Sequence, residues 1–449
     1  MRKEQRKVLA EKYKRLKRKV NRIGVRGILI LLGAGFAVGM CIPLRPEHSD
    51  LEKRDLAAFP KLTASGLWDG SWFSDLSTWY SDTYPIREGL IAGASRVEGL
   101  YGLQGEQIVG GAVQEADEIP DPQDAVVTPA PVSTATPEPT PELEDGTIHQ
   151  EPEMAGDVYI AGDTAFELYY FNQGGADAYA SMINTAQSRV AGTAQVYDLL
   201  APTSFAVCLD EQIQEEMGAS SQRDAFQYIY SRLDPKVKKV DVLDELVKHN
   251  AEYIYFRTDH HWTALGAYYS YRVFAEQKGI EPHELSEFVS RSYPGFLGTF
   301  YAYSNQADAL AANPDTVETY IPAGTNDAEI QPADGEPFQW FVVSDVSEYS
   351  AGSKYSCFIG GDNPFTTIRN PQIHDGSSCV VVKESYGNAF VPWLVDHYEN
   401  VYVVDYRYYT GNLTQFVKDN HVEDVIFVNN ADALSESRAA TMLALFPES

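Results

Sequence analysis

The most regular pattern of apolar and polar segments lies near the C-terminus. Cys379–Lys383, Val401–Val404 and Val425–Val428 are short, nearly continuous apolar runs. The segments between them, from about Asn388 to His397 and Leu413–Asp419, are expected to be helical. Short apolar strands that alternate with helices are typical of a parallel sheet covered on both faces. The sequence therefore predicts an α/β fold with a mostly parallel sheet flanked by helices.

The middle of the chain predicts further elements of the same domain. The helix after residue 263 is well marked, because Thr263 can cap it, aromatic residues recur along it, and Gly279 follows its end. Leu297–Asp375 is rich in Gly, Asn and Asp and is expected to form β-hairpins and long loops. The other expected strands are Val158–Ile160, Gln195–Leu199, Phe205–Leu209 and Glu252–Phe256, and the other expected helices are Ala176–Arg189, Ser221–Leu233 and Val242–His249.

The N-terminal region predicts a membrane anchor. Residues 1–26 hold twelve basic and two acidic side chains, and residues 27–44 form an uncharged run between Arg26 and Arg45. A run of this length can form a transmembrane helix, and the excess of positive charge predicts that residues 1–26 are a cytoplasmic tail. We therefore expect a single-pass cell-membrane protein with its main domain outside; a cleaved signal peptide is the alternative.

Composition divides the rest of the chain into three parts. Residues 45–112 are an aromatic-rich, membrane-proximal segment expected to pack on the main domain. Residues 113–155 are acidic, rich in Pro and Thr and free of aromatic residues, which predicts a disordered linker. Residues 156–449 form the predicted α/β domain.

Charge and cysteine content exclude two classes of protein. After residue 26 the chain has 62 acidic and 23 basic residues, and this argues against a nucleic-acid partner. Cys41 lies in the predicted span, so Cys208, Cys357 and Cys379 allow at most one intramolecular disulfide. The chain is therefore not a disulfide scaffold, and the state of these three thiols stays open.

Two distant segments carry candidate chemistry. In an extended Thr258–Thr263 segment, Asp259 and His261 would face the same side and His260 would point away. Ser385 directly follows the predicted strand Cys379–Lys383, and sites in parallel sheets form at the carboxyl ends of strands. A carboxylate, an imidazole and a hydroxyl together can make an activated nucleophile, which predicts a catalytic Ser385, His261 and Asp259.

Three further residues are candidates for binding substrate or an oxyanion. Tyr386 and Asn388 follow the serine, and Asn388 offers a side-chain donor. Arg407 follows the next strand and could bind an acyl oxygen or an acidic glycan, or form an internal ion pair instead. Trp262 is expected to pack the motif in place rather than to stack on a sugar.

These motifs resemble a known family. Asp259-His260-His261-Trp262, followed by Lys383–Asn388 and Asp405–Tyr409, resemble the DHHW family of bacterial membrane-anchored proteins, which is similar to the SGNH-hydrolase-like alginate O-acetylation proteins. The resemblance implies an SGNH-hydrolase-like domain in which Ser385 is the nucleophile, His261 the base and Asp259 the residue that orients it. It also implies acetyl transfer to, or ester hydrolysis on, an extracellular polysaccharide, with a membrane-bound O-acyltransferase as a candidate partner and with neither a cofactor nor a metal.

Two alternatives remain open. Asp-His-His also names a family of manganese-dependent phosphoesterases, and the further ligands available here are His374, Asp396, His397 and Asp405, which have no convincing spacing. A non-catalytic cell-envelope scaffold or glycan-binding module on the same fold is the other alternative, because a fold does not determine a function.

Overall fold

The structure, a computed structural model, describes residues 48–49, 54–55, 59, 61, 72, 79, 83–84, 116–120 and 145–448. The chain divides into two compact units, Met1–Gln107 and Ile108–Ser449. In the first unit, β1 (His48–Ser49) pairs antiparallel with β2 (Arg54–Asp55). The predicted tail 1–26, the span 27–44 and most of 45–112 lie outside the described residues. Within the described residues, no helix has the length and apolar character needed to cross a membrane.

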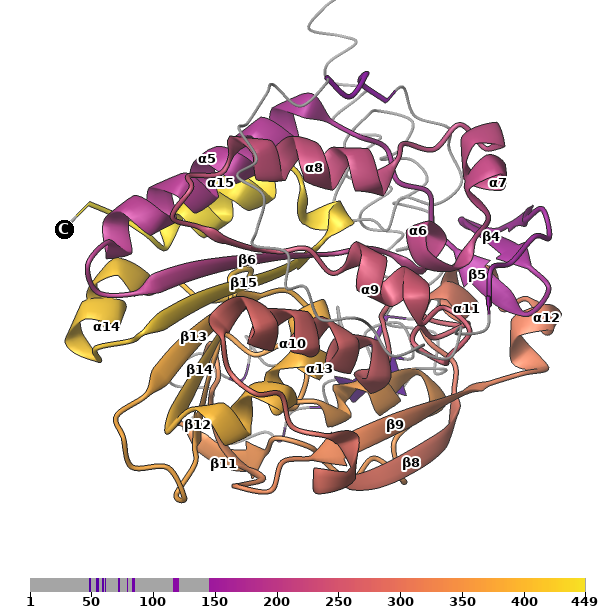
Figure 1. Ribbon diagram of the computed structural model, residues 1–449. Helices are drawn as coiled ribbons and strands as arrows, with labels where there is room; N and C mark the ends of the chain where they lie inside the picture. The colour runs from indigo at the N-terminus through magenta and orange to yellow at the C-terminus, as the bar shows by residue number, and fades with distance from the viewer. Residues whose placement is uncertain are drawn as a thin grey trace, which may run out of the picture. The chain divides into compact units, whose positions relative to one another are not determined.

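An eight-stranded mixed sheet organises the second unit (Figure 1). The strands lie in the order β11-β10-β12-β14-β13-β15-β6-β7, and the five from β14 to β7 are parallel to one another. The other three pair antiparallel. Their bounds are β6 (Gln195–Ala201), β7 (Lys238–Val240), β10 (Asp327–Gln331), β11 (Phe338–Phe341), β12 (Phe365–Arg369), β13 (Ser378–Lys383), β14 (Asn400–Asp405) and β15 (Asp424–Asn430).

The expectation of a mostly parallel sheet is therefore correct for five of the eight strands. The antiparallel part comes from the Gly- and Asn-rich segment 297–375, where a hairpin rather than a helix joins β10 to β11. Antiparallel neighbours need only a short connection, whereas parallel neighbours need a crossover that is long enough to hold a helix.

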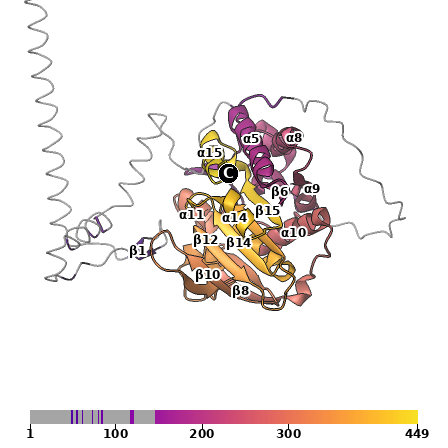
Figure 2. The ribbon, with the colours of Figure 1, turned by 90° about the vertical axis from the view of Figure 1, so that its left-hand side faces the viewer.

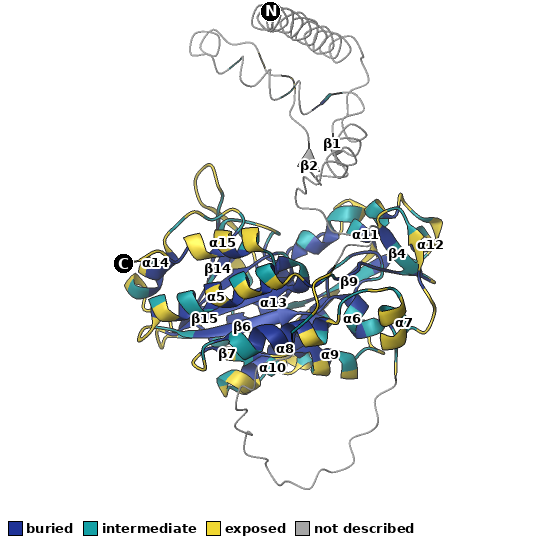
Figure 3. Cartoon of the chain, turned by 90° about the horizontal axis from the view of Figure 1, so that it is seen from above, coloured by how far each residue is buried: buried dark blue, intermediate teal, exposed yellow. Residues whose placement is uncertain are grey.

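Helices cover both faces of the sheet. Val380 and Val382 of β13 point to a core built with α5 (Gln173–Val190), α8 (Gln222–Arg232), α14 (Leu413–Asp419) and α15 (Glu436–Ala444). Val381, between them, points to the opposite core with α10 (Ala264–Lys278), α13 (Tyr386–Phe390) and the 3-10 helix η3 (Val391–His397). The alternation follows from the two-residue repeat of a strand. Figure 3 shows the result, with buried central strands and outer helices that expose one side.

Smaller elements surround this core. A three-stranded sheet combines β3 (Glu153–Ala155), β4 (Val158–Ala161) and β5 (Thr164–Phe166), and a separate hairpin combines β8 (Val289–Phe296) and β9 (Asp315–Ile321). The remaining elements are the helices α6 (Ser204–Cys208), α7 (Glu211–Glu216), α9 (Leu243–Lys248), α11 (Thr299–Tyr303) and α12 (Asp308–Ala311) and the 3-10 helices η1 (Leu285–Glu287), η2 (Ala351–Cys357) and η4 (Ala431–Ala433). Cys208, Cys357 and Cys379 are all free.

Two predicted strands are wrong. Phe205–Leu209 lies in α6, which begins after Pro202 and Thr203. Glu252–Phe256 forms no strand, and one isolated bridge joins Tyr255 to Trp262. An apolar run of five residues has no periodicity that separates a strand from a buried helix or loop, which explains both errors. By contrast, α14 has the predicted bounds.

The described ends of the predicted linker belong to the folded unit. The amide of Asp117 donates to the Phe171 carbonyl at 3.0 Å, and its carboxylate accepts from the Gln173 amide at 2.9 Å. Ile148 forms a parallel bridge with Leu209, and β3 begins at Glu153. The folded unit therefore begins before the predicted boundary at residue 156, because isolated apolar residues anchor a segment whose average composition is polar.

Candidate functional site

A sharp connection from β13 to α13 presents Ser385 at the carboxyl edge of the sheet. β13 ends at Lys383 between β14 and β15, and Ser385 precedes α13 with helical angles (φ −62°, ψ −23°). A Cβ on Gly387 would lie 2.4 Å from the Cβ of Lys383, so only glycine fits at this position. Ser385 is half-buried, whereas the residues on either side of it are buried.

Asp259, His261 and Ser385 form one hydrogen-bonded chain. His261 Nδ1 donates to Asp259 Oδ1 at 2.5 Å, and the Ser385 Oγ lies 2.7 Å from His261 Nε2. Asp259 is 1% and His261 5% exposed, so both are shielded from water. The three predicted catalytic side chains therefore meet although 124 residues separate His261 from Ser385.

Contacts that the sequence did not reveal hold Asp259. Its Oδ2 accepts from the amide and the hydroxyl of Thr299, at 2.8 and 3.0 Å. Gly298 lies against the carboxylate, since a Cβ there would be 2.1 Å from Oδ2. Asp315 fixes the preceding residue by accepting from the Thr258 amide and hydroxyl at 2.7 and 2.6 Å.

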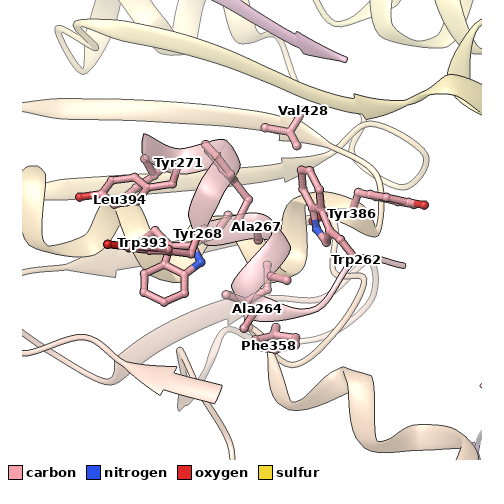
Figure 4. Close-up of a cluster of buried hydrophobic side chains, with 14 of the residues drawn as sticks. Trp262, Ala264, Ala267, Tyr268, Tyr271, Phe358, Tyr386, Trp393, Leu394 and Val428 are labelled. Carbon is pink, nitrogen blue, oxygen red and sulfur yellow. The ribbon is translucent and has the colours of Figure 1, made fainter. Parts of the chain in front are cut away.

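Aromatic side chains attach the histidine loop to the serine turn. Trp262 Nε1 donates to the Tyr386 carbonyl at 3.0 Å, and the two rings meet edge to face with centroids 5.2 Å apart (both are labelled in Figure 4). The Tyr355 ring stacks on His261 with centroids 3.9 Å apart, and its hydroxyl donates to the Ser385 carbonyl at 3.0 Å. Trp262 therefore packs the motif in place. Tyr355 belongs to segment 297–375, in which the sequence predicts hairpins and loops but no residue of the site.

Glu384 connects the serine to the neighbouring strand. Its Oε2 lies 3.1 Å from the Ser385 Oγ and accepts from the Tyr386 amide at 3.1 Å. Its Oε1 accepts from the Asn430 amide at 3.1 Å, at the end of β15. The single hydroxyl proton of Ser385 thus has two acceptors within reach, His261 and Glu384.

The predicted oxyanion- and substrate-binding side chains make internal contacts. The Tyr386 hydroxyl donates to the His260 carbonyl, and Asn388 Nδ2 donates to Asp362 Oδ1 at 2.9 Å. The Arg407 side chain forms two hydrogen bonds to Asp405 and lies 2.8 Å from Asp362. Of the two roles that the sequence leaves open for Arg407, the structure therefore shows the internal ion pair. These contacts lend no support to a direct role of the three side chains in binding an oxyanion.

A buried ion-pair cluster lies beside the serine turn. Lys383 Nζ contacts Asp405 at 2.8 Å and Asp362 at 3.3 Å, and Arg407 completes the cluster. Burial raises the pKa of Asp362, but the charges of Lys383 and Arg407 outweigh burial and lower it overall. The four charges cancel, so the cluster contributes rigidity rather than net charge.

Two further acidic side chains, Glu167 and Asp432, interact electrostatically with the site. Glu167 is 2% exposed, and burial raises its pKa well above its ordinary value, with the charge of Asp432 adding to the effect. Burial raises the pKa of Asp432 to about 6. The charges of Asp259 and Glu384 also act on Glu167, which indicates that the acidic groups of the site and of this pair influence one another.

The backbone around His260 bends instead of extending. The Phe256 amide donates to the His261 carbonyl at 3.2 Å, and the His260 ring lies 3.7 Å from the His261 ring. The expectation that His260 points away is therefore wrong. Asp259, His260 and His261 have ligand atoms within 4.8 Å of one another, so they could hold a metal ion.

Three of the four additional metal ligands considered from the sequence are engaged elsewhere. Asp396 accepts from the Ala323 and Gly324 amides, and His397 contacts the Tyr271 hydroxyl. Asp405 belongs to the ion-pair cluster. In the part of the chain that the structure describes, Asp259, His260 and His261 are the one group of three His, Cys, Asp or Glu residues close enough to share a metal.

Comparison with known proteins identifies the family. The family model described as "DHHW protein" matches residues 52–128 and 138–404. The chain belongs to the DHHW family. A crystal structure of a DHHW family protein from Eubacterium siraeum is 32% identical, with a TM-score of 0.59, and the match covers 65% of this chain and 96% of that one.

One more distant structure shares the fold of this DHHW protein, and another matches it more weakly. Bacillus cereus PatB1 is 18% identical with a TM-score of 0.54, covering 65% of this chain and 98% of PatB1. The O-acetyltransferase domain of Pseudomonas putida AlgJ is 13% identical with a TM-score of 0.35, covering 65% of this chain and 99% of that domain. No curated protein sequence matches the chain. The predicted family is confirmed.

Proposed function

We propose that this DHHW protein is a serine-dependent acyltransferase or esterase that transfers or removes acetyl groups at hydroxyls of a cell-envelope or secreted polysaccharide. The observation that carries the proposal is the hydrogen-bonded chain from Asp259 through His261 to Ser385, with 2.5 and 2.7 Å between its polar atoms. Such a chain activates a hydroxyl for attack on an ester or acyl carbon.

The first half-reaction forms an acyl-enzyme. His261 Nε2 takes the proton of Ser385 as Oγ bonds to the acyl carbon, and the Asp259 carboxylate stabilises the resulting imidazolium. Collapse of the tetrahedral intermediate breaks the bond to the leaving group, which receives the proton from His261 Nε2. Ser385 then carries the acyl group.

The second half-reaction releases that group. His261 Nε2 accepts a proton from a sugar hydroxyl or from water, and the oxygen attacks the acyl carbon. The proton returns to the Ser385 Oγ as the acyl–oxygen bond breaks. A sugar acceptor gives transfer and water gives hydrolysis, so the outcome depends on which acceptor fills the site.

The proposal includes the cellular setting expected from the sequence. Residues 27–44 would span the membrane with residues 1–26 in the cytoplasm, and the catalytic domain would face the envelope. A membrane-bound O-acyltransferase is the proposed partner that would supply the acyl group. The proposal has no resident metal or other cofactor in the reaction.

The test combines turnover with covalent trapping in the full-length protein. With p-nitrophenyl acetate, Ser385→Ala and His261→Ala should each lower kcat/KM by at least about 10³-fold. PatB1 has been solved with a sulfonyl adduct, so phenylmethylsulfonyl fluoride is a suitable trap. We expect mass spectrometry to find one adduct on the peptide containing Ser385, formed with loss of fluoride.

A matched serine substitution on the surface serves as the control. Ser188→Ala, at an exposed position of α5, should retain both turnover and the adduct. Equal turnover in the wild type, Ser385→Ala and His261→Ala, or an adduct confined to other residues, would contradict the proposal.

A non-catalytic scaffold or glycan-binding module is the second candidate. The observation that favours it is that Asn388 and Arg407 are held in internal contacts instead of facing Ser385. This candidate predicts glycan binding without turnover and no sulfonyl adduct on Ser385, so the same experiment separates the two.

A further inference from the structure

A hollow of about 530 Å³ lies along the sheet edge that carries Ser385. Its walls come from the ends of three structural elements: Gln331 at the end of β10, Pro364 and Phe365 at the start of β12, and Tyr408 and Tyr409 beyond β14. None of its lining residues is charged. This volume is typical of small-ligand sites that combine aromatic walls with a few polar groups.

Strand register relates this hollow to the serine. Lys383 pairs with Asp405, Phe365 with Val404, and Gln331 with Phe365, so the ends of β13, β14, β12 and β10 form one continuous edge. Figure 2 shows β10, β12 and β14 side by side with α14 next to them. Because neighbouring strands are about 4.8 Å apart, the hollow lies roughly 10–15 Å along the edge from Ser385.

The intervening surface is electrically neutral and connected by contacts. Asp362 contacts Asn388 of α13 on one side and Arg407 on the other. The Arg407 guanidinium in turn lies 5.3 Å from the centre of the Tyr408 ring. The cluster described above therefore joins the serine turn to the wall of the hollow through a continuous series of contacts.

The lining has the chemistry of a sugar-binding surface. Tyr408 is 49% exposed, and behind it Tyr409 stacks on Phe365 with centroids 5.6 Å apart. An aromatic ring accepts the apolar C–H face of a pyranose, while Gln331 and Thr410 can hydrogen-bond to its hydroxyls. An uncharged lining on a chain with a net charge of −29 disfavours a polyanionic glycan.

We infer that this hollow is a subsite for an uncharged oligosaccharide, placed so that a neighbouring sugar of the same chain reaches Ser385. The inference rests on the proposed acyl chemistry and adds the class of acceptor. At 10–15 Å from the serine, the subsite contacts sugars beyond the acylated one. Long acceptors therefore bind more tightly than disaccharides.

The test measures binding where no chemistry occurs. Full-length Ser385→Ala protein is titrated calorimetrically with cellohexaose and chitohexaose, and with the corresponding disaccharides. We expect at least one hexasaccharide to bind at least tenfold more tightly than its disaccharide. Adding Tyr408→Ala should abolish this gain, whereas Tyr408→Phe, which keeps the ring, should preserve it.

A second blocking variant guards against an indirect effect of Tyr408→Ala. Ala333→Glu places a charged side chain at an exposed position of the lining and should also abolish the gain. Tyr349→Ala removes an aromatic side chain that is 38% exposed but lies outside the lining, and should preserve it.

Two outcomes overturn the inference: neither hexasaccharide binds better than its disaccharide, or the gain survives both Tyr408→Ala and Ala333→Glu. The fate of the proposed function is read separately. If the wild type forms no Ser385 adduct, the proposed acyl chemistry is refuted regardless of how the oligosaccharides bind. If turnover is retained but binding does not depend on oligosaccharide length, only the subsite is refuted.

Discussion

The close approach of Gly298 to Asp259 gives a sharp test of the proposed triad, because a single methyl group should disable it without replacing any of the three catalytic side chains. The Cβ of an alanine at residue 298 would lie 2.1 Å from Asp259 Oδ2 and 2.3 Å from its Cβ. Real Cβ contacts are essentially never shorter than 3.0 Å, so the carboxylate must move by at least about 0.9 Å.

That displacement is large on the scale of a catalytic hydrogen bond. Moving the carboxylate lengthens its 2.5 Å contact with His261 Nδ1 and disturbs the two bonds from Thr299. A misplacement of about 1 Å costs roughly 10² in rate, or about 2.7 kcal/mol of transition-state stabilisation. Loss of the carboxylate in Asp259→Ala should cost more, roughly 10⁴.

The assay compares kcat/KM for p-nitrophenyl acetate in Gly298→Ala, Asp259→Ala and the double variant, with thermal denaturation to check folding. The double variant should be no slower than Asp259→Ala, because both changes disable one unit. The far-downfield proton resonance expected for His261 Nδ1–H should disappear in both single variants, and this readout needs no turnover.

Gly174→Ala is the matched control, since its Cβ meets only the flexible end of the Glu436 side chain at 2.7 Å. A Gly298→Ala protein with kcat/KM within twofold of the wild type and an unchanged resonance would refute the role assigned to Asp259.

Three further predictions concern stability. Burial raises the pKa of Asp198 to about 7, although a hydrogen bond from Tyr179 acts to lower it. The folded state therefore keeps a proton that the unfolded chain loses near pH 4. The free energy of unfolding should fall between about pH 4 and 7 by at most about 4 kcal/mol. Asp198→Asn should flatten this slope in urea denaturation measured at pH 5 and 8, and an unchanged slope would exclude Asp198 as its source. Lys383→Met leaves the buried Asp405 with one cation fewer and should lower the free energy of unfolding by about 3 kcal/mol, measured by urea denaturation at pH 7. A decrease below about 1 kcal/mol would mean that Arg407 alone neutralises Asp405. Trp262→Phe leaves the Tyr386 carbonyl without its buried donor and should lower the unfolding free energy by about 1–3 kcal/mol, whereas a midpoint equal to that of the wild type would show that this bond has no net value.

Prediction from the sequence succeeded where the determining interactions are local. The helix that starts at Ala264 is capped by the Thr263 side chain and closed by Gly279 in a left-handed conformation, as its sequence indicates. The turn from β13 into α13 follows from a five-residue apolar run and a glycine two positions after the serine. It failed for Phe205–Leu209, whose helix depends on its packing neighbours.

The residues of the site likewise divide into those that the sequence predicts and those that it does not. Ser385, His261 and Asp259 could be proposed because their residue types and flanking elements suggest a chemistry. Tyr355, Gly298 and Asp362 could not, because Tyr355 lies in the short 3-10 helix η2 and the other two in loops, and these segments have no periodicity or motif. The sequence makes Asn388 a candidate donor to an oxyanion or substrate, and only the structure shows that its amide donates to Asp362.

By itself, the amino-acid sequence determined the family, the strand–serine–helix turn and the identity of three hydrogen-bonding side chains, since each depends on neighbours within a few positions. Only the tertiary structure decided that three of the eight strands are antiparallel, that Gly298 and Thr299 hold the carboxylate, and that Tyr355 covers the imidazole. The contacts to the carboxylate and the imidazole join segments 39 to 94 residues apart, and a contact between distant segments is set by the packing of the whole domain, which no local pattern of residues records.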